Sequence, residues 1–130
     1  MKEALLSIIK DKNRIITGQI DPQYLSDNLG RKKGTAEAVV FPVSTEEISG
    51  VMRYAWKNNL PVTPRGAGTN LVGSTVPSGH GIVLDVSLMN HILELDEETF
   101  TATVEPGVVL EDFQTYVESK GLFYPPDPGE

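Results

Sequence analysis

Residues 61–75 read PVTPRGAGTNLVGST, and they decide how the whole chain is interpreted. A short apolar run precedes three glycines, Gly66, Gly68 and Gly73, and no acidic residue lies among them. Glycines let the backbone approach a ligand closely, and a concave set of backbone N–H donors binds anions. Arg65 adds a positive charge that either pairs with a phosphate or steadies the loop. Further donors come from the side chains of Thr69, Asn70, Ser74 and Thr75. The pattern favours an anion-binding loop, although composition alone leaves a ligand-free surface loop equally open.

Two familiar phosphate-binding motifs nearly fit this stretch and both fail. The dinucleotide fingerprint G-x-G-x-x-G requires glycine or alanine where Leu71 stands, and a helix directly afterwards. The Walker pattern G-x-x-x-x-G-K-[ST] has Ser74 in the place of its lysine. Without that lysine, hydrolysis of ATP or GTP is not expected. A degenerate Walker loop would still require a helix immediately after Ser74.

The distribution of charge is compatible with an anion site and argues against nucleic acid as a partner. The formal net charge is −7, yet residues 48–84 contain three basic residues and no acidic one. Residues 94–130 carry ten acidic residues and one basic residue. The acid-free window suits a bound anion, or is simply buried core and loop. Binding to nucleic acid needs clustered Lys and Arg, which this chain lacks.

The sequence predicts no metal site and no catalytic residue within this chain. Cysteine is absent, which excludes a disulfide, an iron–sulfur cluster and a Cys-based zinc site. The two histidines, His80 and His91, stand in a glycine-rich loop and at a strand edge. Each is interpreted as a solvated or structural residue.

The clearest predicted helix begins after Ser44. Glu47 follows three residues later, forming a capping box in which each side chain accepts the other residue's free N–H. Asn58 and Asn59 are predicted to end this helix in a left-handed conformation. Apolar residues at helical spacing predict one buried face, with the tryptophan in the core rather than at a cofactor. These residues are Ile48, Val51, Met52, Ala55 and Trp56.

The remaining pattern predicts an α+β fold rather than strict alternation of strands and helices. Further helices are expected over residues 3–11 and 109–121, a loop over 19–35, and strands over 14–17, 37–41, 60–63, 81–86, 92–95 and 100–105. Alternation of apolar and polar residues over 100–105 predicts a half-buried strand. The strands are expected to form one small mixed sheet flanked by the amphipathic helices.

Five stretches in this order resemble the FAD-binding PCMH-type domain of the vanillyl-alcohol oxidase superfamily. They are AVVFPVSTEEI at 38–48, PVTPRGAGT at 61–69, LDVSLMN at 84–90, VEPGV at 104–108 and YPPDP at 124–128. Together they are most similar to the branch that contains the glycolate oxidase flavin subunit and D-lactate dehydrogenase. The resemblance implies the N-terminal half of such a domain.

The resemblance also implies a set of cofactor-binding residues. The glycine-rich loop would hold the FAD pyrophosphate through Pro64, Arg65, Gly66, Ala67, Gly68, Thr69, Asn70, Gly73 and Ser74. A second contacting stretch would begin at Pro126, Asp127 and Pro128. Some members of the family attach the flavin through a histidine in the loop, where this chain has Thr69. The cofactor is therefore expected to be non-covalent FAD.

For the full-length protein the resemblance implies oxidation of a 2-hydroxy acid such as glycolate or D-lactate. Hydride would pass to the flavin and electrons to an acceptor or a partner subunit. The catalytic groups would lie beyond residue 130, so the chain alone is expected to be inactive. Two alternatives stay open: a stand-alone nucleotide- or anion-binding module, and another flavin branch, such as an alditol oxidase, a cell-wall precursor reductase or a molybdenum-hydroxylase flavin subunit.

The chain is expected to divide at residue 35. Residues 1–35 would form a helix and loop segment, and residues 36–130 the N-terminal subdomain of the FAD-binding domain, truncated at its C-terminal end. No apolar run approaches the roughly 20 residues that span a bilayer, and the start is unlike a signal peptide. We expect a cytoplasmic protein, attached to a membrane only through a partner.

Overall fold

The computed structural model describes residues 1–26, 30, 34–67, 77 and 79–126. Its helices are α1 (Lys2–Ile8), α2 (Thr45–Lys57) and α3 (Leu110–Ser119), with short 3-10 turns η1 (Lys12–Arg14) and η2 (Pro22–Leu25). Its strands are β1 (Ile15–Thr17), β2 (Ala36–Val40), β3 (Val62–Arg65), β4 (Gly81–Asp85), β5 (Ile92–Asp96) and β6 (Thr101–Val104). The α+β class expected from the sequence is confirmed. No helix in the described part of the chain is both long and apolar enough to cross a membrane.

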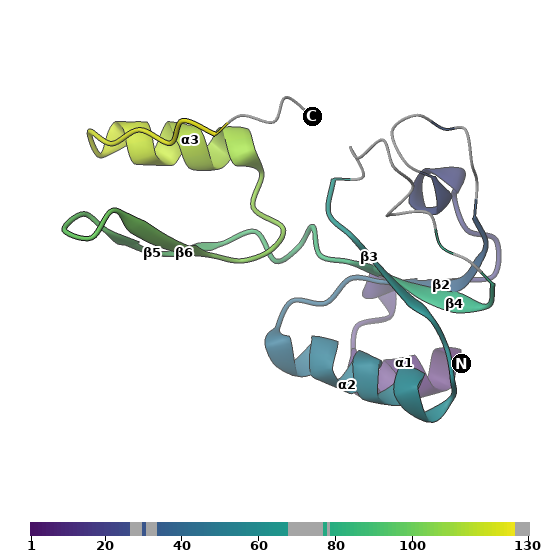
Figure 1. Cartoon of the computed structure of the whole chain (residues 1–130). Helices are drawn as coiled ribbons and strands as arrows, with labels where there is room; N and C mark the ends of the chain where they lie inside the picture. The colour runs from purple at the N-terminus through teal and green to yellow at the C-terminus, as the bar shows by residue number, and fades with distance from the viewer. Residues whose placement is uncertain (27–29, 31–33, 68–76, 78, 127–130) are drawn as a thin grey trace.

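Four strands form a mixed sheet in the order β1-β2-β4-β3. Strand β1 runs antiparallel to β2, whereas β2, β4 and β3 run parallel. Strand β4 is buried along its whole length, which agrees with its apolar residues 81–84 and its place inside the sheet. Helices α1 and α2 lie on one face of this sheet, and η2 lies on the other side (Figure 1).

The core lies between the sheet and the two helices. Side chains alternate along a strand, so Ala38 and Val40 of β2 and Ile82 and Leu84 of β4 belong to the cluster that packs with the helices. Their partners from α1 and α2 are Leu5, Ile9, Val51 and Ala55. Val39 and Val83, on the opposite face, are also fully buried. Both faces of the central strands are thus covered, and the strand ends are held in fixed positions.

Strands β5 and β6 form a separate antiparallel hairpin that α3 accompanies, beside the first sheet (Figure 1). The expected small mixed sheet flanked by helices is confirmed, with α1 and α2 on it, but β5, β6 and α3 lie outside this sheet. The chain is redirected after β4 by a turn in which Met89 N–H donates to the Val86 carbonyl. Gly107 then donates to the Met89 carbonyl at 2.8 Å, and a Cβ at Gly107 would overlap the Val86 carbonyl oxygen. This tight crossing separates the two sheets.

The predicted start and end of α2 are confirmed, with one difference in the cap. The Ser44 hydroxyl accepts the Glu47 N–H at 3.2 Å, as expected of a capping box. The Glu47 carboxylate accepts instead from the N–H of Val43, one residue earlier, at 2.8 Å. Asn59 ends the helix with a φ of 53°, in the left-handed region.

The prediction that Trp56 lies in the core is wrong. The buried face of α2 is centred on Val51 and Ala55, while Trp56 is 83% exposed and Met52 is 45% exposed. Successive residues are about 100° apart around a helix axis, so Trp56 lies one step beyond Ala55 and off the sheet. The apolar stripe predicted for α2 is therefore wider than the part of the helix surface that α1 and the sheet cover.

Candidate functional site

The candidate anion site begins at the carboxyl end of β3. Pro64 and Arg65 end this parallel strand, and Gly66 and Ala67 follow it at the surface. A Cβ built on Gly66 meets no atom within 4 Å, so the space above its backbone is open to a ligand. Ligands of open α/β sheets bind outside the carboxyl ends of the strands. The geometry of these four residues fits the start of a loop that faces an anion.

Arg65 is held at both its backbone and its side chain. Its carbonyl accepts the N–H of Val86 at 2.9 Å, which continues the pairing of β3 with β4. Its guanidinium Nη1 donates to the Ser26 carbonyl at 2.8 Å. Of the two roles that the sequence left open for Arg65, the described contact is one with the protein backbone, at Ser26.

A buried carboxylate lies next to Arg65, where the sequence window contained no acid. Asp85 is the register partner of Arg65 on β4 and is only 4% exposed. Its Oδ1 accepts the N–H of Ser87 at 2.9 Å and so fixes the turn after β4. The window is free of acids along the chain, but in space Asp85 stands beside the start of the loop.

The three basic residues of the acid-free window are not gathered at one place. Arg53 and Lys57 lie in the second half of α2, at the end from which the chain enters β3. Arg65 lies at the other end of β3, where the loop begins. Of the three charges, Arg65 alone stands at the strand end that leads into the candidate site.

The other predicted cofactor residues fall in two groups. Gly68, Thr69, Asn70, Gly73, Ser74, Asp127 and Pro128 lie outside the described residues. Pro126 is described and lies along α3, where its carbonyl accepts a hydrogen bond from Gln114 Nε2 at 3.2 Å. From Pro77 onward the described residues form bends and then β4, so the helix that a degenerate Walker loop requires is not found there.

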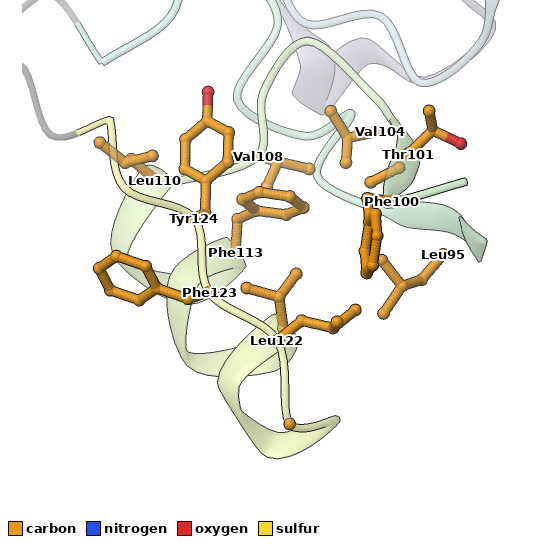
Figure 2. Close-up of a pocket in the computed structure, with 13 residues that line it drawn as sticks. Leu95, Phe100, Thr101, Val104, Val108, Leu110, Phe113, Leu122, Phe123 and Tyr124 are labelled. Carbon is orange, nitrogen blue, oxygen red and sulfur yellow. The ribbon is translucent and has the colours of Figure 1, made fainter. Parts of the chain in front are cut away.

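An apolar groove lies elsewhere, between the β5–β6 hairpin and α3. Its volume is about 660 Å³, and Phe113 stacks edge-on against Tyr124 at its side, with ring centroids 5.0 Å apart. Figure 2 shows side chains from the hairpin, from α3 and from the segment after α3 lining the same space. Such a surface has the wrong chemistry for a dianionic pyrophosphate, which needs polar donors. The groove is therefore not the anion site.

The prediction of a half-buried strand over residues 100–105 is wrong in its burial. All four residues of β6 are exposed, and Phe100, just before the strand, is 76% exposed. The alternating pattern is present, but its apolar side chains border the groove rather than a closed core. The strand is thus not half-buried in this chain.

The two histidines are surface residues with carboxylate neighbours. His80 lies 3.4 Å from Glu37 and its side chain is 87% exposed. His91 Nδ1 lies 2.5 Å from Glu105 Oε1, which also accepts the His91 backbone N–H. These hydrogen bonds from His91 lower the pKa of Glu105. No group of three or more His, Cys, Asp or Glu in the described residues could hold a metal ion.

Comparison with known proteins agrees with this arrangement. The family model described as "FAD binding domain" matches residues 36–130. The glycolate oxidase subunit GlcD of Bacillus subtilis is 43% identical over 128 residues, covering 98% of this chain and 27% of that protein. A D-lactate dehydrogenase of Anaerostipes hadrus is 38% identical over 123 residues, covering 94% and 26%.

Solved structures show the same fold. An alkyldihydroxyacetonephosphate synthase superposes with a TM-score of 0.80 at 21% identity, covering 95% of this chain and 28% of that one. At this identity the likeness concerns the fold alone. The family match covers well over half of the chain, which therefore belongs to the FAD binding domain family. The chain spans about a quarter of the length of the curated relatives named above.

Proposed function

We propose that this chain is the pyrophosphate-holding part of the FAD site in an oxidoreductase that acts on a small 2-hydroxy acid, of the glycolate or D-lactate type. The observation that carries the proposal is the glycine-rich stretch of sequence that begins at the carboxyl end of β3, in a chain that belongs to the FAD binding domain family. Two relatives named for glycolate and D-lactate support the substrate class.

The residues proposed to hold the cofactor are those that the sequence indicated. Backbone N–H groups of the loop would face the two phosphates, because fixed donors without Cβ interference suit a dianion. The described residues fit this role: the backbone of Gly66 is open, and Arg65 brings a cation to the strand end. The proposed set is Pro64, Arg65, Gly66, Ala67, Gly68, Thr69, Asn70, Gly73, Ser74, Pro126, Asp127 and Pro128.

Bound flavin would supply the hydride acceptor, while this chain contributes binding and orientation. With Thr69 in the loop, the proposed FAD is non-covalent. The full-length protein would pass electrons to an acceptor or a partner subunit, since one relative is itself named as a subunit. We place residues 1–35 as a helix and loop segment ahead of the subdomain formed by residues 36–130, and the enzyme in the cytoplasm.

The test uses the full-length protein. After purification, acid precipitation should leave the flavin in the supernatant, and the flavin should elute as FAD. Under anaerobic conditions glycolate, D-lactate and a larger 2-hydroxy acid are added separately, and bleaching of the flavin absorbance is followed. Reduction by at least one of them supports the proposal. Bound FAD that none of them reduces would refute the substrate class, and a protein that binds no FAD would refute the cofactor and leave the anion-binding module.

A further inference from the structure

Four described residues ahead of β2 lie together beside the candidate site. The Gly34 N–H donates to the Leu25 carbonyl at 2.6 Å, which brings residues 25 and 34 side by side. The neighbouring residues Ser26 and Thr35 then lie there as well. We call residues 25, 26, 34 and 35 the base segment.

One end of the glycine-rich stretch is fastened to the base segment by Arg65. The guanidinium Nη1 reaches the Ser26 carbonyl across 39 positions of sequence, at 2.8 Å. Because the backbone of Arg65 is fixed in the sheet by Val86, this bond joins the base segment to a rigid point.

The other end is fastened by Thr35. Its N–H donates to the Pro77 carbonyl at 3.2 Å, and its Oγ1 donates to the Gly79 carbonyl at 3.0 Å. Gly34 packs so closely here that a Cβ on it would overlap the Pro77 carbonyl oxygen. Residues on both sides of the stretch 66–76 are therefore tied to the same base segment.

We propose that the base segment is a clamp that holds the described residues at the two ends of the glycine-rich stretch, with Arg65 and Thr35 as positioning residues for FAD. This inference rests on the function proposed above. Ordering a loop on binding a ligand has an entropic cost that grows with its length, and a loop whose ends are already fixed loses less on binding. Thr35 then acts through Pro77 and Gly79, and Arg65, which also belongs to the proposed cofactor-binding set, joins the base segment through Ser26.

The test measures FAD affinity and the FAD dissociation rate in the full-length protein. Thr35→Val removes the hydroxyl donor with little change in shape, and Thr35→Ser keeps it. Arg65→Met removes the donor to Ser26, and Arg65→Lys keeps a cationic donor. Thr45→Val is the matched control, because Thr45 is exposed on α2. Losing one such bond should weaken FAD binding by about three- to tenfold and speed FAD release by a similar factor.

The expected pattern separates positioning from general stability. Thr35→Val and Arg65→Met should bind FAD more weakly while their apoproteins unfold at the wild-type temperature, and Thr35→Ser and Arg65→Lys should restore most of the affinity. If Thr35→Val fails to fold, Thr35→Ala, which removes the same hydroxyl, takes its place, because Arg65 also belongs to the proposed cofactor-binding set and Arg65→Met alone would not separate the clamp from a direct contact with phosphate. Wild-type affinity in the variants that lack the donor overturns the clamp alone, and so does a loss of affinity that merely follows a loss of apoprotein stability. A wild-type protein without FAD overturns the proposed function, and the clamp with it.

Discussion

Arg14 and Glu47 join the N-terminal segment to the start of α2. The guanidinium Nη1 and Nη2 donate to the two carboxylate oxygens at 2.7 and 2.9 Å, and Nη1 also donates to the Phe41 carbonyl. The hydrogen bonds from Arg14 are the largest effect on the pKa of Glu47 and lower it. Partial burial of the carboxylate is the next largest effect and opposes this shift. A bidentate contact between an arginine and a carboxylate that are both partly buried is stronger than an ordinary surface ion pair.

We predict that Glu47→Gln destabilises the fold at neutral pH by about 1–3 kcal/mol. The carboxylate binds a proton less readily in the folded chain than in the unfolded chain. Its contribution is therefore fully present above its ordinary pKa of 4.5 and is lost as the pH falls through the lower folded value. Urea unfolding of both proteins at a series of pH values measures the difference, which should shrink as the solution becomes acidic.

Glu46→Gln is the control for this experiment, since Glu46 lies exposed in the same helical turn. It should change stability little at any pH. A difference between wild type and Glu47→Gln that stays constant down to acidic pH would show that the Arg14 contact does not depend on the carboxylate charge.

Among the elements, those with strong local signals could be predicted from the sequence. The cap at Ser44 and the left-handed Asn59 mark the ends of α2, and Gly121, with a φ of 78°, follows the end of α3. Such signals act within a few residues and survive in any fold. The strand that precedes the glycine-rich stretch could likewise be predicted, because strand patterns are local.

What the sequence could not predict depends on contacts between distant segments. Strands β4 and β6 end in different sheets because the crossing at Gly107 turns the chain between them. The contacts of the base segment could not be predicted for the same reason. Ser26 contributes only a backbone carbonyl, and Thr35 is one of several polar residues between 19 and 35. Arg65 and Asp85 are neighbours only through strand register.

Helix α2 carries buried and exposed apolar residues, and we predict different effects of replacing them. Val51→Ala should destabilise the fold by about 1–3 kcal/mol, because it removes fully buried methyl groups. Trp56→Ser should change stability by less than about 0.5 kcal/mol, because this side chain is mostly in water. Urea unfolding followed by circular dichroism measures both.

Trp56 is the single tryptophan of the chain, so its fluorescence gives an independent check. In the wild type, iodide should quench the emission almost as strongly as it does in the unfolded chain. Weak quenching, or a large loss of stability in Trp56→Ser, would show that Trp56 is buried in the core after all.

The whole molecule has one well-packed part and one that leaves apolar surface open. The central strands of the first sheet are buried on both faces, whereas the hairpin and α3 border a groove of about 660 Å³ with several exposed side chains. These include Phe100, Val104 and Phe123. Contiguous apolar surface of this kind is unusual on a free monomer, and a two-stranded hairpin is marginally stable without further packing.

We predict that the 130-residue chain binds a hydrophobic dye such as ANS through this groove. Phe100→Ser should reduce the dye fluorescence at least about twofold, because it removes the most exposed aromatic ring bordering the groove. Val43→Ser is the control, since Val43 is exposed but lies outside the groove. Equal dye binding by Phe100→Ser and wild type would mean that the groove is closed in solution.

Titration of FAD into full-length apoprotein, with Gly68→Val beside wild type, examines whether the backbone after β3 binds the FAD pyrophosphate. The added side chain would occupy the space proposed for the phosphates, so we expect Gly68→Val to bind FAD more than about tenfold more weakly than wild type, at unchanged apoprotein stability. A Gly68→Val protein that binds FAD as tightly as wild type would contradict this role for the backbone.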